Sequence, residues 1–62
     1  MKTSELIKLI KRETNCYKTR SGSNHDIWFN PKTGVEFLIP RHKSQELPKG
    51  TERNIRKAAG LD

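Results

Sequence analysis

Apolar residues are scarce in this chain, and their scarcity limits the folds that it can adopt. They make up 31% of its 62 residues and fall into a few short clusters. A domain of this size buries only roughly 60% of the surface that its unfolded chain exposes, so the core must be small. A deep substrate cavity would consume the volume that holds such a fold together. We therefore expect one domain over residues 1–62, with any active site on its surface or at an interface with a partner.

Two of the apolar clusters have the spacing of amphipathic helices. The first runs over residues 3–14, where Thr3 or Ser4 is the candidate cap. The second runs over residues 49–59, and Gly60 follows it at the position where glycine commonly ends a helix. The chain is thus expected to begin and end with a helix.

Three segments between these helices have the composition of strands, and two turns separate them. The expected strands are residues 16–21, 25–29 and 35–39. Residues 21–24 form the first turn. Residues 30–34 form the second, with proline where a type I turn accepts it and glycine where the hairpin closes. The pattern predicts an α+β fold, a single small α-β-β-β-α domain in which a three-stranded antiparallel sheet carries both helices on one face.

The alternation along the second expected strand assigns its residues to the two faces of the sheet. Ile27 and Phe29 are expected to face the helices and Trp28 to lie on the open side, and His25 shares the side of Ile27 and Phe29 if the strand is regular up to its first residue. His25 then needs a position at the rim of the sheet, or a bulge at residues 24–25, to reach solvent. Trp28 is interpreted either as a base-stacking platform or as a cross-strand packing partner.

Charge and cysteine content indicate the partners and the compartment. Thirteen Lys and Arg stand against seven Asp and Glu, a formal net charge of +6, so either RNA or an acidic protein is a natural partner. The single cysteine, Cys16, excludes an intrachain disulfide. No apolar run approaches the roughly 20 residues of a membrane helix. We expect a cytoplasmic protein that has no membrane partner.

The turn Gly22-Ser23-Asn24-His25 is the candidate site of chemistry. Gly22 tolerates unusual backbone conformations, and Ser23 and Asn24 can hydrogen-bond their own backbone, so the turn can approach a phosphate closely. A histidine ring ordinarily titrates near neutrality, which suits a group that takes up a proton and later returns it. His25 is therefore the candidate for proton transfer. The alternative is a hairpin turn that carries a surface histidine.

Several cationic residues flank this turn in the sequence or lie on adjoining strands, and they are candidates for binding RNA or stabilising negative charge. They are Lys18, Arg20, Arg41, His42 and Lys43. For each of them, ordinary surface charge is the alternative. His42 is also a candidate for a second proton-transfer group. The soft ligands match no common zinc spacing and the carboxylates do not cluster, so we expect neither a metal site nor a cofactor.

These motifs, taken in order, resemble the HicA toxins, small endoribonucleases of toxin–antitoxin pairs whose fold resembles the double-stranded RNA-binding domain. The resemblance covers nearly the whole chain, and it is carried by residues 3–6, 22–28, 31–34, 39–42, 49–51, 55 and 59–61. It implies that the protein cleaves mRNA, that the histidine of a glycine-serine-histidine turn, here His25, carries the activity, and that a HicB-like antitoxin covers it. Because the chain offers no metal-ligand pattern, we expect this cleavage to need no metal ion.

Two positions near the active histidine depart from the family pattern. Asn24 stands between the serine and His25, where many members have no residue. Asp26 stands where the family often has a second histidine, and we interpret it either as a residue that orients His25 or raises its basicity, or as a solvent-facing carboxylate.

Two functions from different classes remain open on the sequence. One is a ribonuclease toxin, and the other is a non-catalytic RNA-binding module that holds duplex or structured RNA. A duplex-binding domain would be expected to carry a lysine-rich helix start, and residues 48–51 contain only one lysine.

Overall fold

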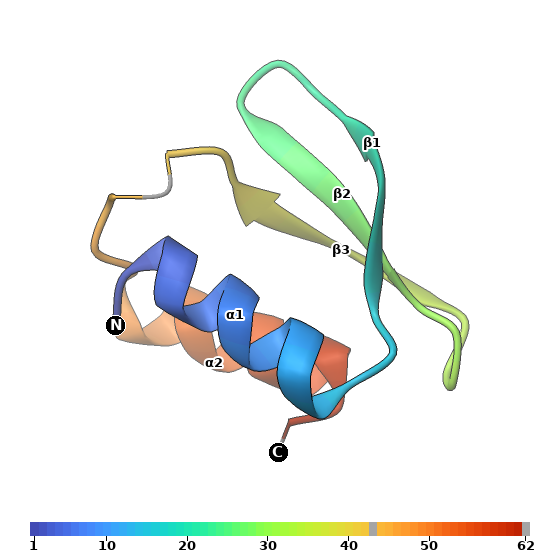
Figure 1. The fold of residues 1–62 in the computed structure, drawn as a ribbon. Coiled ribbons are helices and arrows are strands. Elements are labelled where there is room, and N and C mark those ends of the chain that lie inside the picture. The colour runs from blue at the N-terminus through green and yellow to red at the C-terminus, as the bar shows by residue number, and fades with distance from the viewer. Residues whose placement is uncertain (43, 62) are drawn as a thin grey trace.

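The sheet and the two helices form separate layers in the computed structural model, which describes residues 1–42 and 44–61. The elements in chain order are α1 (Thr3–Glu13), β1 (Tyr17–Ser21), β2 (His25–Asn30), β3 (Val35–Pro40) and α2 (Lys49–Ala59). The strands pair antiparallel in the order β1-β2-β3. Figure 1 shows both helices on one side of the sheet. The predicted α-β-β-β-α fold is confirmed.

Helix α1 begins ahead of its expected caps. Lys2 is the N-cap residue, and its backbone N–H donates to the Glu5 carboxylate at 2.8 Å. Thr3 is instead fully buried, and its backbone N–H and hydroxyl donate to the Gln45 carbonyl at 3.0 and 3.2 Å. The prediction that Thr3 or Ser4 caps this helix was wrong, because the threonine hydroxyl serves a contact with a segment far along the chain.

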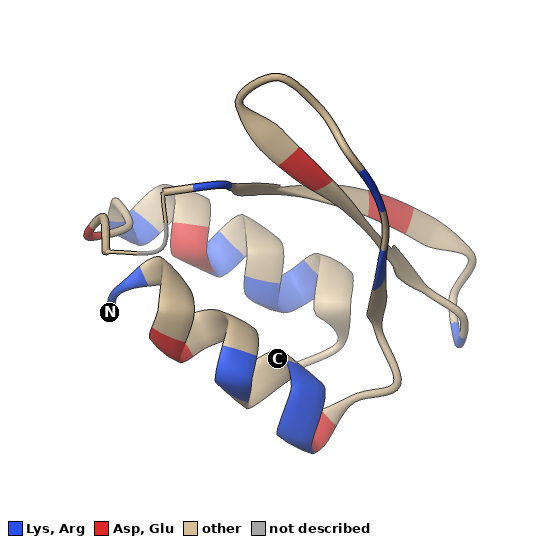
Figure 2. Cartoon of the chain, turned by 45° about the horizontal axis from the view of Figure 1, so that its top comes forward, with Lys and Arg blue, Asp and Glu red and all other residues tan. Residues whose placement is uncertain are grey.

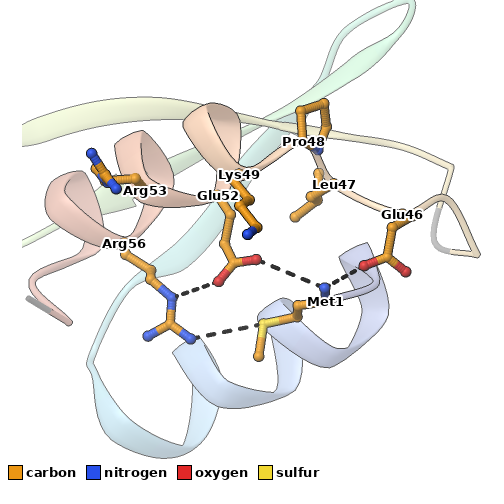
Figure 3. Close-up of a pocket in the computed structure, with 8 residues that line it drawn as sticks. All are labelled: Met1, Glu46, Leu47, Pro48, Lys49, Glu52, Arg53 and Arg56. Carbon is orange, nitrogen blue, oxygen red and sulfur yellow. Dashed lines mark hydrogen bonds and ion pairs between the residues drawn. The ribbon is translucent and has the colours of Figure 1, made fainter.

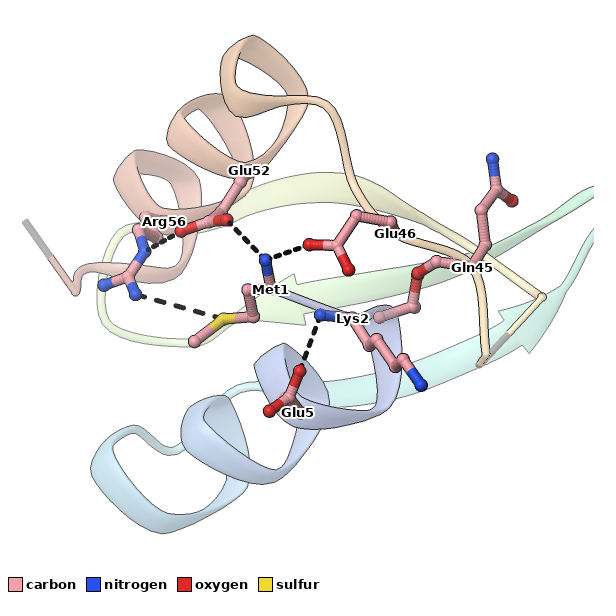
Figure 4. Close-up of polar contacts among 8 residues, drawn as sticks. Met1, Lys2, Glu5, Gln45, Glu46, Glu52 and Arg56 are labelled. Carbon is pink, nitrogen blue, oxygen red and sulfur yellow. Dashed lines mark hydrogen bonds and ion pairs between the residues drawn. The ribbon is translucent and has the colours of Figure 1, made fainter.

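The segments that precede the two helices lie side by side (Figure 4). Lys2 and Glu46 form an isolated antiparallel bridge, and the Leu47 N–H donates to the Met1 carbonyl at 3.1 Å. The N-terminal ammonium of Met1 pairs with Glu46 and lies 3.8 Å from the Glu52 carboxylate. These contacts fasten the loop between β3 and α2 to the start of α1.

The core lies between the sheet and the helices, and it uses the opposite face of β2 from the one predicted. Trp28 is 3% exposed and stacks on Phe37, its cross-strand neighbour, with ring centroids 6.5 Å apart. Ile27 and Phe29 therefore lie on the open face. The prediction was wrong because β2 offers apolar residues on both sides, and the indole ring has the larger surface to bury. The buried apolar residues are Leu6, Ile10, Cys16, Trp28, Phe37, Ile39, Leu47, Ile55 and Ala59.

Helix α2 has the predicted bounds and the predicted ending. Gly60 adopts the left-handed conformation with φ 86°, and the Leu61 N–H donates to the Arg56 carbonyl at 2.9 Å. Neither α1 nor α2 is long and apolar enough to cross a membrane.

Asn30 ties the β2–β3 hairpin to the end of α2. Its side chain is buried, with Nδ2 donating to the Ala58 carbonyl at 2.9 Å and Oδ1 accepting from the Lys32 N–H at 3.0 Å. Its backbone carbonyl accepts from the Gly34 N–H at 2.8 Å, and Gly34 has φ 75°, as the turn sequence predicted.

We expect Asn30→Ala to lower the free energy of unfolding by about 1–3 kcal/mol, because the substitution leaves the Ala58 carbonyl and the Lys32 N–H without this partner. Asn54→Ala is the matched control, since Asn54 is exposed on α2, and it should change stability by less than about 0.5 kcal/mol. Urea denaturation followed by circular dichroism measures both. Equal effects of the two substitutions would contradict the role given to Asn30.

We also expect stability to depend on the ionisation of the Met1 ammonium. Its hydrogen bond to Glu46, helped by the charges of Glu46, Glu52 and Glu5, raises its pKa above the ordinary value of 8.0. This contribution is fully present below about pH 8 and is lost as the pH rises through the raised pKa. The stability difference between the wild type and Glu46→Gln should therefore shrink from about pH 7 to about pH 10. A difference that stays constant over this range would contradict the pairing.

Candidate active site

The turn between β1 and β2 holds His25 at the first position of β2. The Gly22 N–H donates to the His25 carbonyl at 2.7 Å and so closes the turn. A Cβ on Gly22 would lie 2.8 Å from this carbonyl oxygen, closer than Cβ atoms in proteins essentially ever approach a neighbour. The turn therefore requires glycine for space, and not for a left-handed backbone, because Gly22 has no positive φ.

The His25 side chain is exposed on the open face of the sheet. Pairing between β2 and β3 is regular over both strands, so His25 lies on the same side as Ile27, away from the helices. The irregularity of the sheet lies in β1, between Lys18 and Arg20, and not at residues 24–25 where a bulge was considered. The imidazole thus reaches solvent directly, because the face of β2 that carries it is the open one.

Arg41 fastens the turn from the end of β3. Its Nη1 donates to the Gly22 carbonyl at 2.9 Å and to the Ser23 carbonyl at 3.4 Å, while its backbone N–H donates to the Asn24 carbonyl at 3.2 Å. Its Nε lies 3.6 Å from Oδ1 of Asp26. The side chain remains 49% exposed, and a guanidinium has five N–H donors, so Arg41 can position the turn and still face an anionic ligand.

Asp26 points to the helix side of the sheet and therefore away from His25. Its side chain is only 14% exposed, and its Oδ1 accepts no hydrogen bond from the described residues. The interpretation as a solvent-facing carboxylate is therefore wrong, and so is direct orientation of the imidazole. The carboxylate instead faces Arg41 and so supports the residue that fastens the turn.

The two cationic residues predicted on β1 lie on different faces. Arg20 is opposite Ile27, so it lies on the face that carries His25. Lys18 is opposite Trp28, and both line a hollow of about 330 Å³ on the helix side. Trp28 is buried, so neither face of its ring is free to stack on a base, and of the two earlier interpretations only the cross-strand partner agrees with its position.

The loop beyond β3 carries the remaining predicted residues. His42 is exposed, and its carbonyl accepts from the Gln45 N–H at 3.0 Å. No hydrogen bond within residues 1–42 and 44–61 joins its ring to His25. Lys43 lies outside the described residues.

Sequence reasoning missed an aromatic pair on the open face. Tyr17 and Phe29 are cross-strand neighbours whose rings meet edge to face, with centroids 5.8 Å apart at an interplanar angle of 63°. Tyr17 is 51% exposed. The alternation along β2 predicts Phe29 in the core and assigns no binding role to Tyr17. Had Trp28 been placed toward the helices, Phe29 and its cross-strand neighbour Tyr17 would have been predicted together on the open face.

A separate hollow of about 590 Å³ lies where the N-terminus meets α2 (Figure 3). Its lining residues are Met1, Glu46, Leu47, Pro48, Lys49, Glu52, Arg53 and Arg56. The Glu52 carboxylate there accepts from Nε of Arg56 at 3.0 Å and also faces the Met1 ammonium. This hollow includes no residue of the β1–β2 turn, and these charged groups already pair with one another.

Positive charge is spread over the molecule and is not confined to the turn. Figure 2 shows Lys and Arg segments in both helices, in β1 and at the end of β3. Such a distribution attracts polyanions generally without selecting a site. Over residues 1–42 and 44–61, no three His, Cys, Asp or Glu side chains form a group that could hold a metal ion.

Comparison with known protein families assigns this arrangement to one of them. The model of the HicA toxin of bacterial toxin–antitoxin systems matches residues 3–61. The chain belongs to the HicA toxin family. The match spans every element from α1 to α2 and includes the turn with His25, which makes the protein the toxin component of a toxin–antitoxin system. No curated protein matches the chain significantly.

We expect Gly22→Ala to lower the free energy of unfolding by about 1–3 kcal/mol, because the new methyl group must displace the His25 carbonyl. Gly50→Ala is the matched control. A Cβ at Gly50, in the first turn of α2, meets nothing within 4 Å, so the change should leave stability unaltered or raise it by up to about 1 kcal/mol. Urea denaturation measures both, and amide chemical shifts report any displacement at His25. A Gly22→Ala protein as stable as the wild type, with unchanged shifts, would contradict the steric argument.

Proposed function

We propose that this HicA toxin is an endoribonuclease that cleaves mRNA, with His25 as general acid or base. The observation that carries the proposal is an exposed imidazole on a turn that glycine and Arg41 fasten in place, in a chain of net charge +6. A proton-transfer group must be reachable by substrate and held in position, and His25 meets both conditions.

RNA brings its own nucleophile to such a site. The ribose 2′-oxygen attacks the adjacent phosphorus, the bond from phosphorus to the 5′-oxygen breaks, and a 2′,3′-cyclic phosphate remains on one product. The proton of the 2′-hydroxyl must be removed, and the departing 5′-oxygen must receive one. His25 performs one of these transfers, which typically contributes about 10²- to 10⁴-fold in rate.

Cationic groups near His25 are suited to the negative charge that develops on the phosphate. Arg20 lies on the same face of the sheet, and the half-exposed Arg41 lies against the turn. Gly22, Ser23 and Asn24 form the backbone that approaches the phosphate. Preorganised donors of this kind often supply the largest part of catalysis, and they require no metal ion.

We infer that a HicB-like antitoxin neutralises the toxin by covering His25. The net charge of +6 favours rapid association with an acidic partner, and an exposed residue on an open sheet face is easily covered. Because the proposed substrate is mRNA, the toxin acts in the cytoplasm.

We expect His25→Ala to reduce the rate of RNA cleavage by about 10²- to 10⁴-fold without loss of fold. His42→Ala tests the candidate for the second proton transfer, and Asn54→Ala, exposed on α2, is the control that should retain most of the activity. The assay follows cleavage of a labelled RNA in the presence of EDTA, where the wild type should remain active. When expressed in cells, the wild type and the control variant should inhibit growth, and the His25→Ala protein should not.

Three results would contradict the proposed function. Cleavage by a folded His25→Ala protein would exclude His25 as the proton-transfer group. Loss of wild-type activity in EDTA, with recovery on addition of magnesium, would exclude metal-independent chemistry. A wild-type protein that binds RNA and never cleaves it would favour a non-catalytic RNA-binding module.

A further inference from the structure

The face of the sheet that carries His25 also carries an exposed apolar surface, which we call the open-face platform. Its residues are Tyr17, Ile27, Phe29 and Leu38. We propose that the platform binds single-stranded RNA by stacking bases on Tyr17 and Phe29. The inference rests on the proposed function and adds to it the form of RNA that the site accepts.

The pairing of the strands brings the platform and the proposed catalytic residue to one face. Tyr17 is opposite Phe29, and Ile27 is opposite Leu38, so all four side chains project from the same side as His25. Phe29 is four residues from His25 along β2, a separation of about 14 Å at roughly 3.4 Å per residue. A strand of a few nucleotides can therefore extend from the aromatic pair to the imidazole.

The platform is open to solvent. Tyr17 is 51% and Leu38 54% exposed, and both helices lie on the other side of the sheet (Figure 1). No element within residues 1–42 and 44–61 covers it. An exposed apolar patch on a small domain commonly marks a binding surface, and here the patch adjoins the proposed site of cleavage.

Charge varies along the platform in a way that suits an RNA strand. Arg20 lies on the open face opposite Ile27, toward the end with His25 where a reacting phosphate would sit. Arg41 lies against the turn at that end, beside Asp26. Glu36, opposite Phe29, lies at the other end and repels phosphate there. Uncharged base rings suit the aromatic end, and the charged backbone suits the end with the imidazole.

Base stacking on the platform requires that the faces of the bases be free. In a duplex these faces are stacked on one another, whereas unpaired strands and loops offer them to aromatic side chains. The open-face platform is therefore suited to unpaired segments of mRNA.

The test uses the His25→Ala protein, so that RNA is not consumed, and a fluorescein-labelled single-stranded 12-nucleotide RNA of mixed sequence. Tyr17→Ala in this background should raise the dissociation constant by about 5- to 100-fold, the usual effect of removing a base-stacking ring. Tyr17→Phe keeps the ring and should stay within about threefold of the parent. Fluorescence anisotropy measures the affinities, and circular dichroism confirms the fold.

Val35→Ala is the matched control, because Val35 is 44% exposed but lies outside the platform, opposite the buried Asn30 on the other face of the sheet. It should also stay within about threefold of the parent. A blunt duplex of the same RNA should bind more weakly than the single strand, and Tyr17→Ala should not alter its affinity.

The inference is overturned if the parent does not bind the single strand, or if Tyr17→Ala and Val35→Ala have equal effects on RNA affinity. It is also overturned if Tyr17→Ala leaves RNA affinity unchanged and weakens binding of a purified HicB-like antitoxin, since the platform would then be a protein-docking surface. The proposed function fails by a different result. If a folded His25→Ala protein cleaved RNA, His25 would lose its catalytic assignment. The RNA affinities of the Tyr17 variants would still decide whether the platform binds RNA.

Discussion

The stack of Trp28 on Phe37 determines which side of each strand faces the solvent. β2 carries apolar residues on both sides, so its sequence permits either orientation, and the large indole ring decides between them by entering the core. Because β2 and β3 pair in regular register, the orientation of β2 also fixes which residues of β3 face the helices. Because successive residues point to opposite faces, burial of Trp28 places Asp26 with the helices and His25 in the open.

A second constraint holds the proposed catalytic turn in place. Arg41 donates to carbonyl groups of the turn and faces Asp26, while Gly22 permits a contact with the His25 carbonyl that any other residue would obstruct. The turn is thus fastened by the end of β3, with the acidic neighbour of His25 on the opposite face of the sheet. A chain with a small core can hold a surface site in this way, through backbone hydrogen bonds that need little buried volume.

Local patterns predicted the elements and failed where distant segments compete for the same residue. Turn chemistry identified both turns, Gly60 ended α2 as expected, and helical spacing placed the helices to within a residue or two. The cap of α1 was missed because the Thr3 hydroxyl bonds to a carbonyl 42 residues away. The orientation of β2 was missed because alternation alone does not rank a tryptophan against an isoleucine and a phenylalanine. The histidine turn was visible in the sequence, whereas its attachment to Arg41 and the aromatic pair beside it depend on strand register.

The bridge between Lys2 and Glu46 has a consequence for synthesis of the toxin on the ribosome. Residues 1–3 are held by residues 45–47, so the start of α1 gains these contacts only after residue 47 has been made. Contacts between such distant segments form after local ones, because closing the intervening loop costs chain entropy. The start of α1 therefore completes its contacts later than the two β-hairpins, whose strands are neighbours in the sequence.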